Sequence, residues 1–215
     1  MLKKKNTFDE APIRYSLDAP FETVEAYNSL VSNLIRLASD EGYKSIAVTS
    51  ASYGEGKAGV SINIAIALAQ NLLSKKILLV DSDLRRSDVS SFMCPDAKSG
   101  LSDCFEENAD EPAIIKSDIA NLDLLSAGSL RSNPTGILRS DKMGSMLKTL
   151  EERYDYVIID TAPVNDYADA LFLADRVSGF IVATKRKVSS VSKIDVATSR
   201  IESSGAKILG FVFSE

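Results

Sequence analysis

The sequence predicts an α/β protein in which a mostly parallel, doubly wound sheet is flanked by helices in three layers. Short apolar runs without polar alternation, such as residues 76–81 and 156–160, are typical of strands buried on both faces. Stretches with helical spacing separate these runs, which favours a parallel sheet. A length of 215 residues, 45% of them hydrophobic, suits one domain with a sizeable core. We therefore expect a single domain over residues 18–215, preceded by a flexible arm of residues 1–17.

Helices and strands are expected to alternate along this domain. The first helix, residues 20–39, carries apolar residues on one side, and Pro20 suits its first turn. Residues 94–118 are the least regular stretch, where we expect short helices and loops. The other expected elements are strands at residues 44–50, 76–81, 122–125, 156–160, 180–183 and 208–213, and helices at 57–73, 134–152, 166–176 and 189–203.

Composition limits the kinds of function that are open to this chain. The net charge of −5 argues against a general nucleic-acid-binding protein, because contacts with phosphates require a basic surface. The sequence has no histidine, which excludes histidine-based catalysis and the usual zinc sites. Its cysteines, Cys94 and Cys104, imply no disulfide framework. No apolar run approaches the roughly 18 residues that span a bilayer, and no signal peptide is recognisable, so we predict a cytoplasmic protein.

Three of the expected strands end in residues suited to phosphate or metal chemistry. The first runs into SYGEGK (residues 52–57) and then a helix, so backbone N–H groups, a helix N-terminus and a lysine can face phosphate oxygens. The second ends in DSDLRR (residues 81–86), and a later one ends in DTAP (residues 160–163). Ligands of an open α/β sheet bind beyond the carboxyl ends of its strands. These segments should therefore meet at one edge of the sheet.

Each of these segments also has a simple structural explanation. A glycine turn before Lys57 is often only a turn, Asp81 or Asp160 can cap the next helix, and the two arginines can be a solvated charged turn. Their joint occurrence at one edge favours a functional site over coincidence.

The same segments resemble the motifs of a known family. ASYGEGK, ILLVDSDLR and YVIIDTAP are similar to the Walker A, A′ and B motifs of the bacterial tyrosine kinases of capsule and exopolysaccharide systems. The resemblance extends over about residues 20–213, including INIAIALAQ after the loop, GLSDCF and SAGSLRSNPTGIL. It implies a P-loop nucleotide-binding, kinase-like domain that transfers the γ-phosphate of Mg-ATP to tyrosine. The expected activity is that of a non-specific protein-tyrosine kinase that regulates polysaccharide synthesis or export.

By matching position, the resemblance implies roles for individual residues. Asp81, Asp83 and Asp160 would organise Mg²⁺, and Asp81 would be the base that deprotonates the tyrosine hydroxyl. Arg85 would steady phosphate charge and would complete a catalytic set with Lys57 and the first two of these aspartates. ATP or ADP would be held by Ser52, Tyr53, Gly54, Glu55, Gly56, Lys57, Ala58 and Gly59.

The resemblance also implies partners. They are a membrane-embedded activator of the polysaccharide co-polymerase type, tyrosine-containing protein substrates and an opposing tyrosine phosphatase, with no nucleic acid. The activator would recruit this cytoplasmic chain to the inner face of the cell membrane. The chain could also form a homo-oligomer, because family members assemble through a helix with a Glu-x-x-Arg-x-x-Arg pattern. Glu25 matches this pattern, but Asn28 and Val31 replace its two arginines.

The sequence departs from the family pattern at positions that affect the chemistry. Ala58 stands where the family has a serine or threonine whose hydroxyl ligates magnesium, and Gly59 follows where threonine is usual. Ser61 lies one turn further, about 60° round the helix, and is a poor substitute unless a water intervenes. The family's tyrosine-rich tail has no counterpart, and residues 213–215 replace a segment whose asparagine helps to read adenine. We expect nucleotide binding with weakened magnesium dependence and reduced or absent transfer.

Two alternatives remain open at this stage. A nucleotide-binding pseudokinase or scaffold of the same machinery is favoured by Ala58, Gly59 and the absent tail, whereas the intact aspartates oppose it. A partitioning-type ATPase is less favoured, because Ala51 and Ser52 stand where such proteins have a lysine early in the loop.

Overall fold

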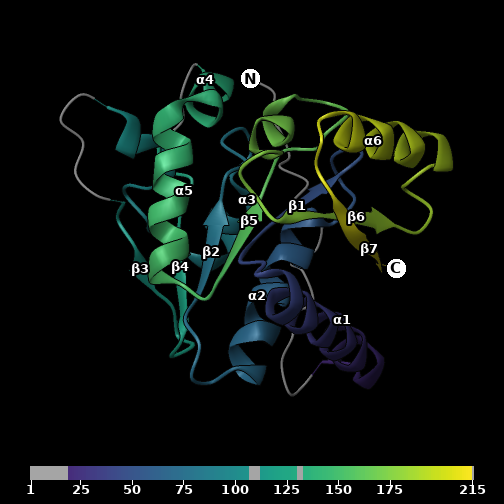
Figure 1. The fold of residues 1–215 in the computed structure, drawn as a ribbon, viewed down its shortest axis with the longest axis horizontal. Coiled ribbons are helices and arrows are strands. Elements are labelled where there is room, and N and C mark those ends of the chain that lie inside the picture. Colours follow the sequence, from purple (N-terminus) through teal and green to yellow (C-terminus); the bar gives the residue numbers. More distant parts are fainter. Residues whose placement is uncertain (1–18, 107–111, 130–132, 215) are drawn as a thin grey trace, which may run out of the picture.

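Strands β1 to β7 form one sheet in the order β3-β4-β2-β5-β1-β6-β7 (Figure 1). This is a computed structural model, and it describes residues 19–106, 112–129 and 133–214. Neighbouring strands are parallel except for β3, which pairs antiparallel with β4. The predicted doubly wound, mostly parallel α/β fold is thus confirmed. The predicted arm, residues 1–17, lies outside the described residues.

The elements of the structure follow the expected alternation. The strands are β1 (Ser45–Ser50), β2 (Ile77–Asp81), β3 (Ile115–Lys116), β4 (Leu122–Leu125), β5 (Tyr156–Asp160), β6 (Gly179–Lys185) and β7 (Ile208–Ser214). The helices are α1 (Phe21–Glu41), α2 (Lys57–Asn71), α3 (Asp88–Met93), α4 (Pro134–Arg139), α5 (Asp141–Arg153) and α6 (Val191–Ser203), with 3₁₀ helices η1 (Leu101–Phe105) and η2 (Asp169–Leu173).

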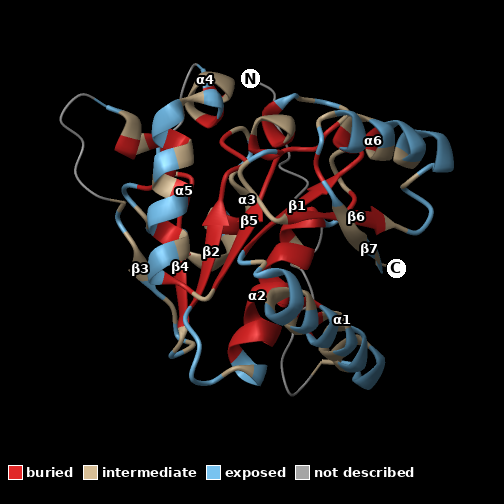
Figure 2. Cartoon of the chain, viewed as in Figure 1, coloured by how far each residue is buried: buried red, intermediate tan, exposed pale blue. Residues whose placement is uncertain are grey.

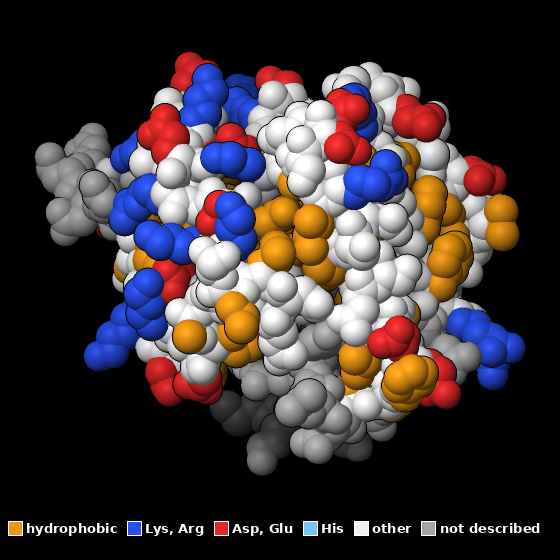
Figure 3. Space-filling view, turned by 60° about the horizontal axis from the view of Figure 1, so that its bottom comes forward, with side chains coloured by type: hydrophobic (Ala, Val, Ile, Leu, Met, Phe, Trp, Pro, Cys, Tyr) orange, Lys and Arg blue, Asp and Glu red, His pale blue; other side chains and the backbone are white. Residues whose placement is uncertain are grey.

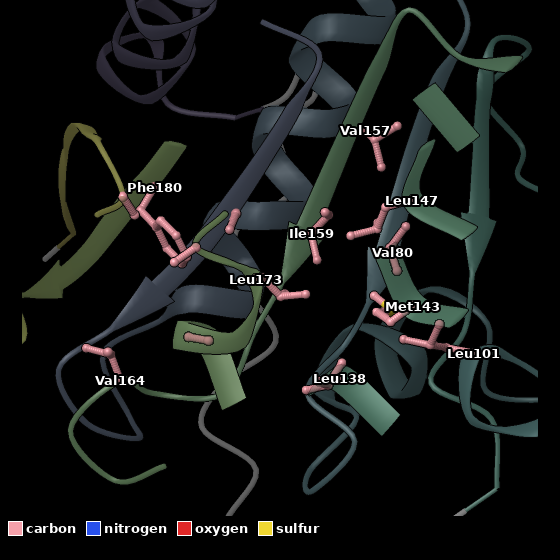
Figure 4. Close-up of a cluster of buried hydrophobic side chains, with 14 of the residues drawn as sticks. Val80, Leu101, Leu138, Met143, Leu147, Val157, Ile159, Val164, Leu173 and Phe180 are labelled. Carbon is pink, nitrogen blue, oxygen red and sulfur yellow. The ribbon is translucent and has the colours of Figure 1, made fainter. Parts of the chain in front are cut away.

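Two apolar cores hold the three layers together. On one face α2 and α3 pack on the sheet and α1 packs on α2, so that α2 is buried along most of its length (Figure 2). On the other face α4, α5, α6 and η2 pack on the sheet, where Val80, Leu147, Ile159 and Phe180 belong to one cluster (Figure 4). Successive residues of β2 and β5 alternate between the two clusters, as the period of a strand requires.

Two predicted helices differ from the structure. The prediction of one helix over residues 134–152 is wrong, because Ser140 is extended (ψ 153°) and its side chain accepts the Met143 N–H, which ends α4 and caps α5. The helical segment predicted near residues 166–176 is shorter in the structure. It is the 3₁₀ helix η2 over Asp169–Leu173, whose three-residue repeat places Ala170 and Leu173 together in the core.

The strand order brings the predicted site segments together. β5 lies between β1 and β2, and Asp81 pairs in register with Asp160. Because these strands run parallel, the loop after β1 and the ends of β2 and β5 share one edge of the sheet. Both Cys94 and Cys104 are free thiols. None of the described helices is both long and apolar enough to cross a membrane.

Candidate nucleotide and phosphoryl-transfer site

The loop between β1 and α2 has a backbone that its glycines make possible. Gly54 and Gly56 have φ values of 86° and 82°, a left-handed conformation that glycine adopts without strain. Gly56 is the N-cap of α2, so the helix begins directly at Lys57. Glu55 is buried, and its Oε2 accepts the Ser52 N–H at 2.8 Å, which closes the loop on itself. The loop therefore presents a helix N-terminus and turned backbone, the arrangement that binds phosphate.

Lys57 lies between two buried carboxylates. Its Nζ is 2.7 Å from Asp83 Oδ2 and 3.0 Å from Asp160 Oδ2, and the Lys57 side chain is 5% exposed. Burial alone would lower the pKa of Lys57, but the charges of Asp160 and Asp83 outweigh it and raise the pKa above the ordinary value. The ammonium group therefore stays charged although it is buried.

Asp81 is fully buried and is held by hydrogen bonds to α3. Its Oδ2 accepts from the N–H and the hydroxyl of Ser90, at 2.8 and 2.6 Å, and its Oδ1 accepts the Asp83 N–H at 3.2 Å. Burial raises the pKa of Asp81, and the charge of Asp160 adds to this effect. A carboxylate with a raised pKa is suited to accept a proton near neutral pH.

Ser61 contacts Asp160 directly. The Ser61 hydroxyl donates to Asp160 Oδ1 at 2.8 Å and also lies 2.9 Å from the Lys57 carbonyl oxygen. This contact brings Ser61 to the site, and its expected weakness as a substitute metal ligand stays a prediction. Ala58, by contrast, offers no polar atom at its buried position. Burial also raises the pKa of Asp160, although the charge of Lys57 opposes the rise.

The carboxylates fit a divalent cation in their chemistry and their convergence. Asp83 Oδ2 and Asp160 Oδ2 both lie within 3.0 Å of one point, which the Lys57 ammonium occupies. Carboxylate oxygens are the ligands that Mg²⁺ prefers. Within the described residues, no group of three or more acidic or thiol side chains is already arranged around a metal position. The chemistry of Asp83 and Asp160 thus fits Mg²⁺, and the position between them is occupied by the Lys57 ammonium.

The two arginines after β2 stack on the rings of two tyrosines, Tyr167 and Tyr53. Arg85 pairs with Asp169, with distances of 2.6 Å from Nε to Oδ2 and 3.1 Å from Nη2 to Oδ1, and its guanidinium carbon lies 3.9 Å from the Tyr167 ring centroid. Arg86 lies over the Tyr53 ring at 4.8 Å. The structure thus brings Lys57, Asp81, Asp83 and Asp160 together but directs Arg85 to η2. Its expected contact with phosphate stays a prediction.

Other residues at this edge carry no sequence signal that could have identified them. Lys193, near the start of α6, places its Nζ 3.3 Å from Ser52 Oγ. Asp166 Oδ2 accepts the Tyr53 N–H at 3.3 Å, and Ser214 Oγ lies 3.5 Å from the position of a Cβ on Gly56. The contacts of Lys193 and Asp166 join residues separated by 141 and 113 positions in sequence, so only the fold reveals them.

Comparison with known proteins agrees with this geometry. A family model described as an AAA domain matches residues 43–204. The tyrosine-protein kinase CpsD of Streptococcus pneumoniae is 36% identical over 195 residues, which cover 89% of this chain and 83% of that relative. This chain belongs to the bacterial tyrosine-protein kinase family. The resemblance of the three strand-end motifs to this family is therefore confirmed.

Solved structures place the kinase within the wider P-loop fold. The kinase domain of the Escherichia coli tyrosine kinase ETK superposes with a TM-score of 0.81 at 26% identity, covering 89% of this chain and 74% of that domain. The septum site-determining protein MinD of Pyrococcus horikoshii, complexed with Mg-ADP, has a TM-score of 0.64 at 25% identity, covering 79% and 69% of the two chains. The higher score for the kinase domain agrees with the family assignment.

Proposed function

We propose that this family member is an ATP-dependent protein-tyrosine kinase of a bacterial capsule or exopolysaccharide system. The observation that carries the proposal is the convergence of Lys57, Asp83 and Asp160 beside the glycine loop. These groups supply a cation for phosphate and carboxylates for metal and proton. The relatives named as tyrosine-protein kinases, and the Mg-ADP in the MinD complex, support ATP or ADP as the nucleotide and Mg²⁺ as its metal.

In this proposal the loop holds the nucleotide and the aspartates complete the site. The backbone N–H groups of residues 54–57 bind the phosphates, and Lys57 leaves Asp83 and Asp160 to contact the terminal phosphate. Mg²⁺ held by Asp81, Asp83 and Asp160 would neutralise charge on the phosphate oxygens. Asp81 accepts the proton of the incoming tyrosine hydroxyl, as its raised pKa permits. The remaining residues of the predicted nucleotide-binding set, within residues 52–59, contact the nucleotide and position it.

The proposed partners follow from the family. We propose that a membrane-embedded activator of the co-polymerase type recruits the kinase to the inner face of the membrane, that tyrosine-containing proteins are its substrates and that a tyrosine phosphatase opposes it. Self-association also belongs to this proposal. We also propose that residues 18–215 act as the single catalytic domain.

Incubation with labelled ATP and Mg²⁺ tests the proposed activity. The acceptors are a soluble copolymer of glutamate and tyrosine and, in a parallel reaction, the cytoplasmic segment of the activator. We expect phosphotyrosine in at least one reaction, together with nucleotide binding in the micromolar range by calorimetry. The absence of any binding heat with ATP and ADP would contradict the proposal at its first step.

A second candidate function is a nucleotide-binding scaffold without phosphoryl transfer. The buried methyl group of Ala58, in place of a metal-binding hydroxyl, favours it. Nucleotide binding without phosphotyrosine, with or without the activator segment, would support this scaffold in place of the kinase.

A further inference from the structure

Tyr53 places a tyrosyl hydroxyl inside the site. Its side chain rises from the glycine loop, and its hydroxyl lies 3.3 Å from Asp83 Oδ1. The other oxygen of the same carboxylate, Asp83 Oδ2, is 2.7 Å from Lys57 Nζ. One carboxylate therefore contacts both a tyrosyl hydroxyl and the lysine that would hold the terminal phosphate.

Several contacts fix Tyr53 in this position. The Arg86 guanidinium lies over one face of the ring at 4.8 Å, and the ring meets Tyr167 edge-to-face at 6.1 Å and 65°. The Tyr53 N–H donates to Asp166 Oδ2 at 3.3 Å. Arg85 in turn lies over Tyr167. The ring is thus packed by an aromatic and a cationic partner from two segments and is not a freely rotating surface side chain.

The chemistry of this position matches that of an acceptor. A phenol needs a base in order to react as a nucleophile. Asp83 Oδ1 is within reach of the phenolic proton. Positioning of the acceptor next to the phosphate is the main requirement of phosphoryl transfer.

We propose that Tyr53 is a phosphorylation site of the chain's own active site, an inference that rests on the proposed kinase function. In this reaction Tyr53 Oη forms a bond to the γ-phosphorus of ATP as the bond from that phosphorus to the β–γ bridging oxygen breaks. ADP is the leaving group, and the phenolic proton passes to the Asp83 carboxylate. The product is a phosphotyrosine in the loop that holds the nucleotide, and transfer takes place within one chain.

Mapping of phosphopeptides by mass spectrometry tests this inference. The dephosphorylated full chain is incubated with Mg-ATP, in the presence and absence of the glutamate–tyrosine copolymer. We expect phosphate on Tyr53 with a first-order rate that does not change when the protein is diluted. Tyr43→Phe, at a partly buried tyrosine that contacts Lys207, is the matched control and should leave the Tyr53 phosphate unchanged. Tyr53→Phe should lose this phosphopeptide.

The possible results separate this inference from the kinase function itself. Phosphate on the copolymer but not on Tyr53 would overturn the inference and leave the kinase function standing. A Tyr53 phosphorylation rate that rises with protein concentration would overturn transfer within the chain. Phosphate on neither acceptor would overturn both.

A binding measurement provides a readout that does not depend on transfer. If the Tyr53 hydroxyl lies beside the terminal phosphate, Tyr53→Phe removes a hydrogen bond that ATP can use and ADP cannot. We expect about fivefold weaker binding of ATP, with the affinity for ADP nearly unchanged. Equal changes for the two nucleotides in calorimetry would contradict the placement of Tyr53 at the acceptor position.

Discussion

Two clusters of charged side chains lie at opposite edges of the sheet, and they differ in burial and in the balance of positive and negative charge. The carboxyl-edge cluster consists of Lys57, Asp81, Asp83 and Asp160, which are all buried. The amino-edge cluster consists of Asp123, which accepts from the Tyr154 hydroxyl at 2.8 Å, and Lys116 at 2.7 Å, whose side chain is 80% exposed. The first cluster has three carboxylates and one ammonium, whereas the second has one of each and reaches solvent.

A large cavity lies beside the amino-edge cluster, although this cluster holds less buried charge than the carboxyl-edge cluster. A cavity of about 500 Å³ lies at the amino edge, lined by residues that include Lys76, Lys116, Asp123, Arg153 and Tyr154. Lys and Arg side chains also gather on the face that Figure 3 turns forward. Asp123 already has partners from within the chain, so this cluster has a structural explanation. The carboxyl-edge cluster holds buried negative charge in excess, which a bound cation would relieve.

Removing one carboxylate from each cluster should give the largest difference in kinase activity between the two edges. Asp81→Asn removes the proposed base, so we expect phosphotyrosine formation to fall by about 10²–10⁴-fold. Asp123→Asn keeps an oxygen for the Tyr154 hydroxyl and loses a pair with an exposed lysine, so transfer should change little. The measurement is the initial rate with the copolymer at saturating Mg-ATP. Similar losses of activity in the two variants would contradict the proposed division of roles.

Removing the lysine from each cluster tests nucleotide binding. Lys57→Met removes the cation that contacts the terminal phosphate, so we expect calorimetry to show at least about a hundredfold loss of ATP affinity. Lys116→Met is the control at the opposite edge, and its affinity should match that of the wild type. Circular dichroism confirms that both variants fold. Retention of tight ATP binding by a folded Lys57→Met protein would show that the nucleotide does not need this lysine.

The sequence predicted the positions of most strands because they are long enough and apolar on both faces, as β2 and β5 show. It could not predict β3, which has only two residues and is defined by the pairing of Ile115 with Leu124. The helix α3 was also missed, within a stretch dominated by polar residues. The break at Ser140 depends on a local cap that competes with continued helical hydrogen bonding.

The convergence of Lys57, Asp83 and Asp160 was predictable, because parallel strands carry their ends to one edge. The pairing of Lys57 with these carboxylates was not, since it depends on side-chain directions. The contact of Ser61 with Asp160 and that of Tyr53 with Asp83 have the same origin. The position of Arg85 depends on Asp169, which no motif connects to it.

Restoring the hydroxyl at position 58 should sharpen the carboxyl-edge cluster as a metal site. Ala58→Thr adds an oxygen ligand, so we expect about a tenfold stronger dependence of ATP affinity on Mg²⁺. Titration of ATP at several Mg²⁺ concentrations measures the change. Ser199→Thr, at an exposed position of α6, is the control for an added methyl group. An unchanged Mg²⁺ dependence in Ala58→Thr would mean that Ala58 does not face the metal.

The excess negative charge should also make the ligand-free kinase less stable as the pH rises. Burial raises the pKa values of Asp81 and Asp160 above the ordinary aspartate value of about 4. Between that value and neutral pH the folded chain retains protons that the unfolded chain has released, so stability is lost as the pH increases through this range. We expect the free energy of unfolding in urea to fall by about 1–3 kcal/mol from about pH 5 to about pH 7.5.

Variants show whether this loss of stability comes from the carboxyl edge. Asp81→Asn cannot release a proton there, so its stability should depend less steeply on pH than that of the wild type. Asp123→Asn should keep the wild-type slope, because Asp81 and Asp160 at the carboxyl edge are both intact in this variant. Saturating Mg²⁺ with ADP should reduce the slope as well, since a bound cation favours the ionised carboxylates over their protonated forms. An equal slope in wild type and Asp81→Asn would place the titrating groups elsewhere and remove the electrostatic distinction between the two clusters.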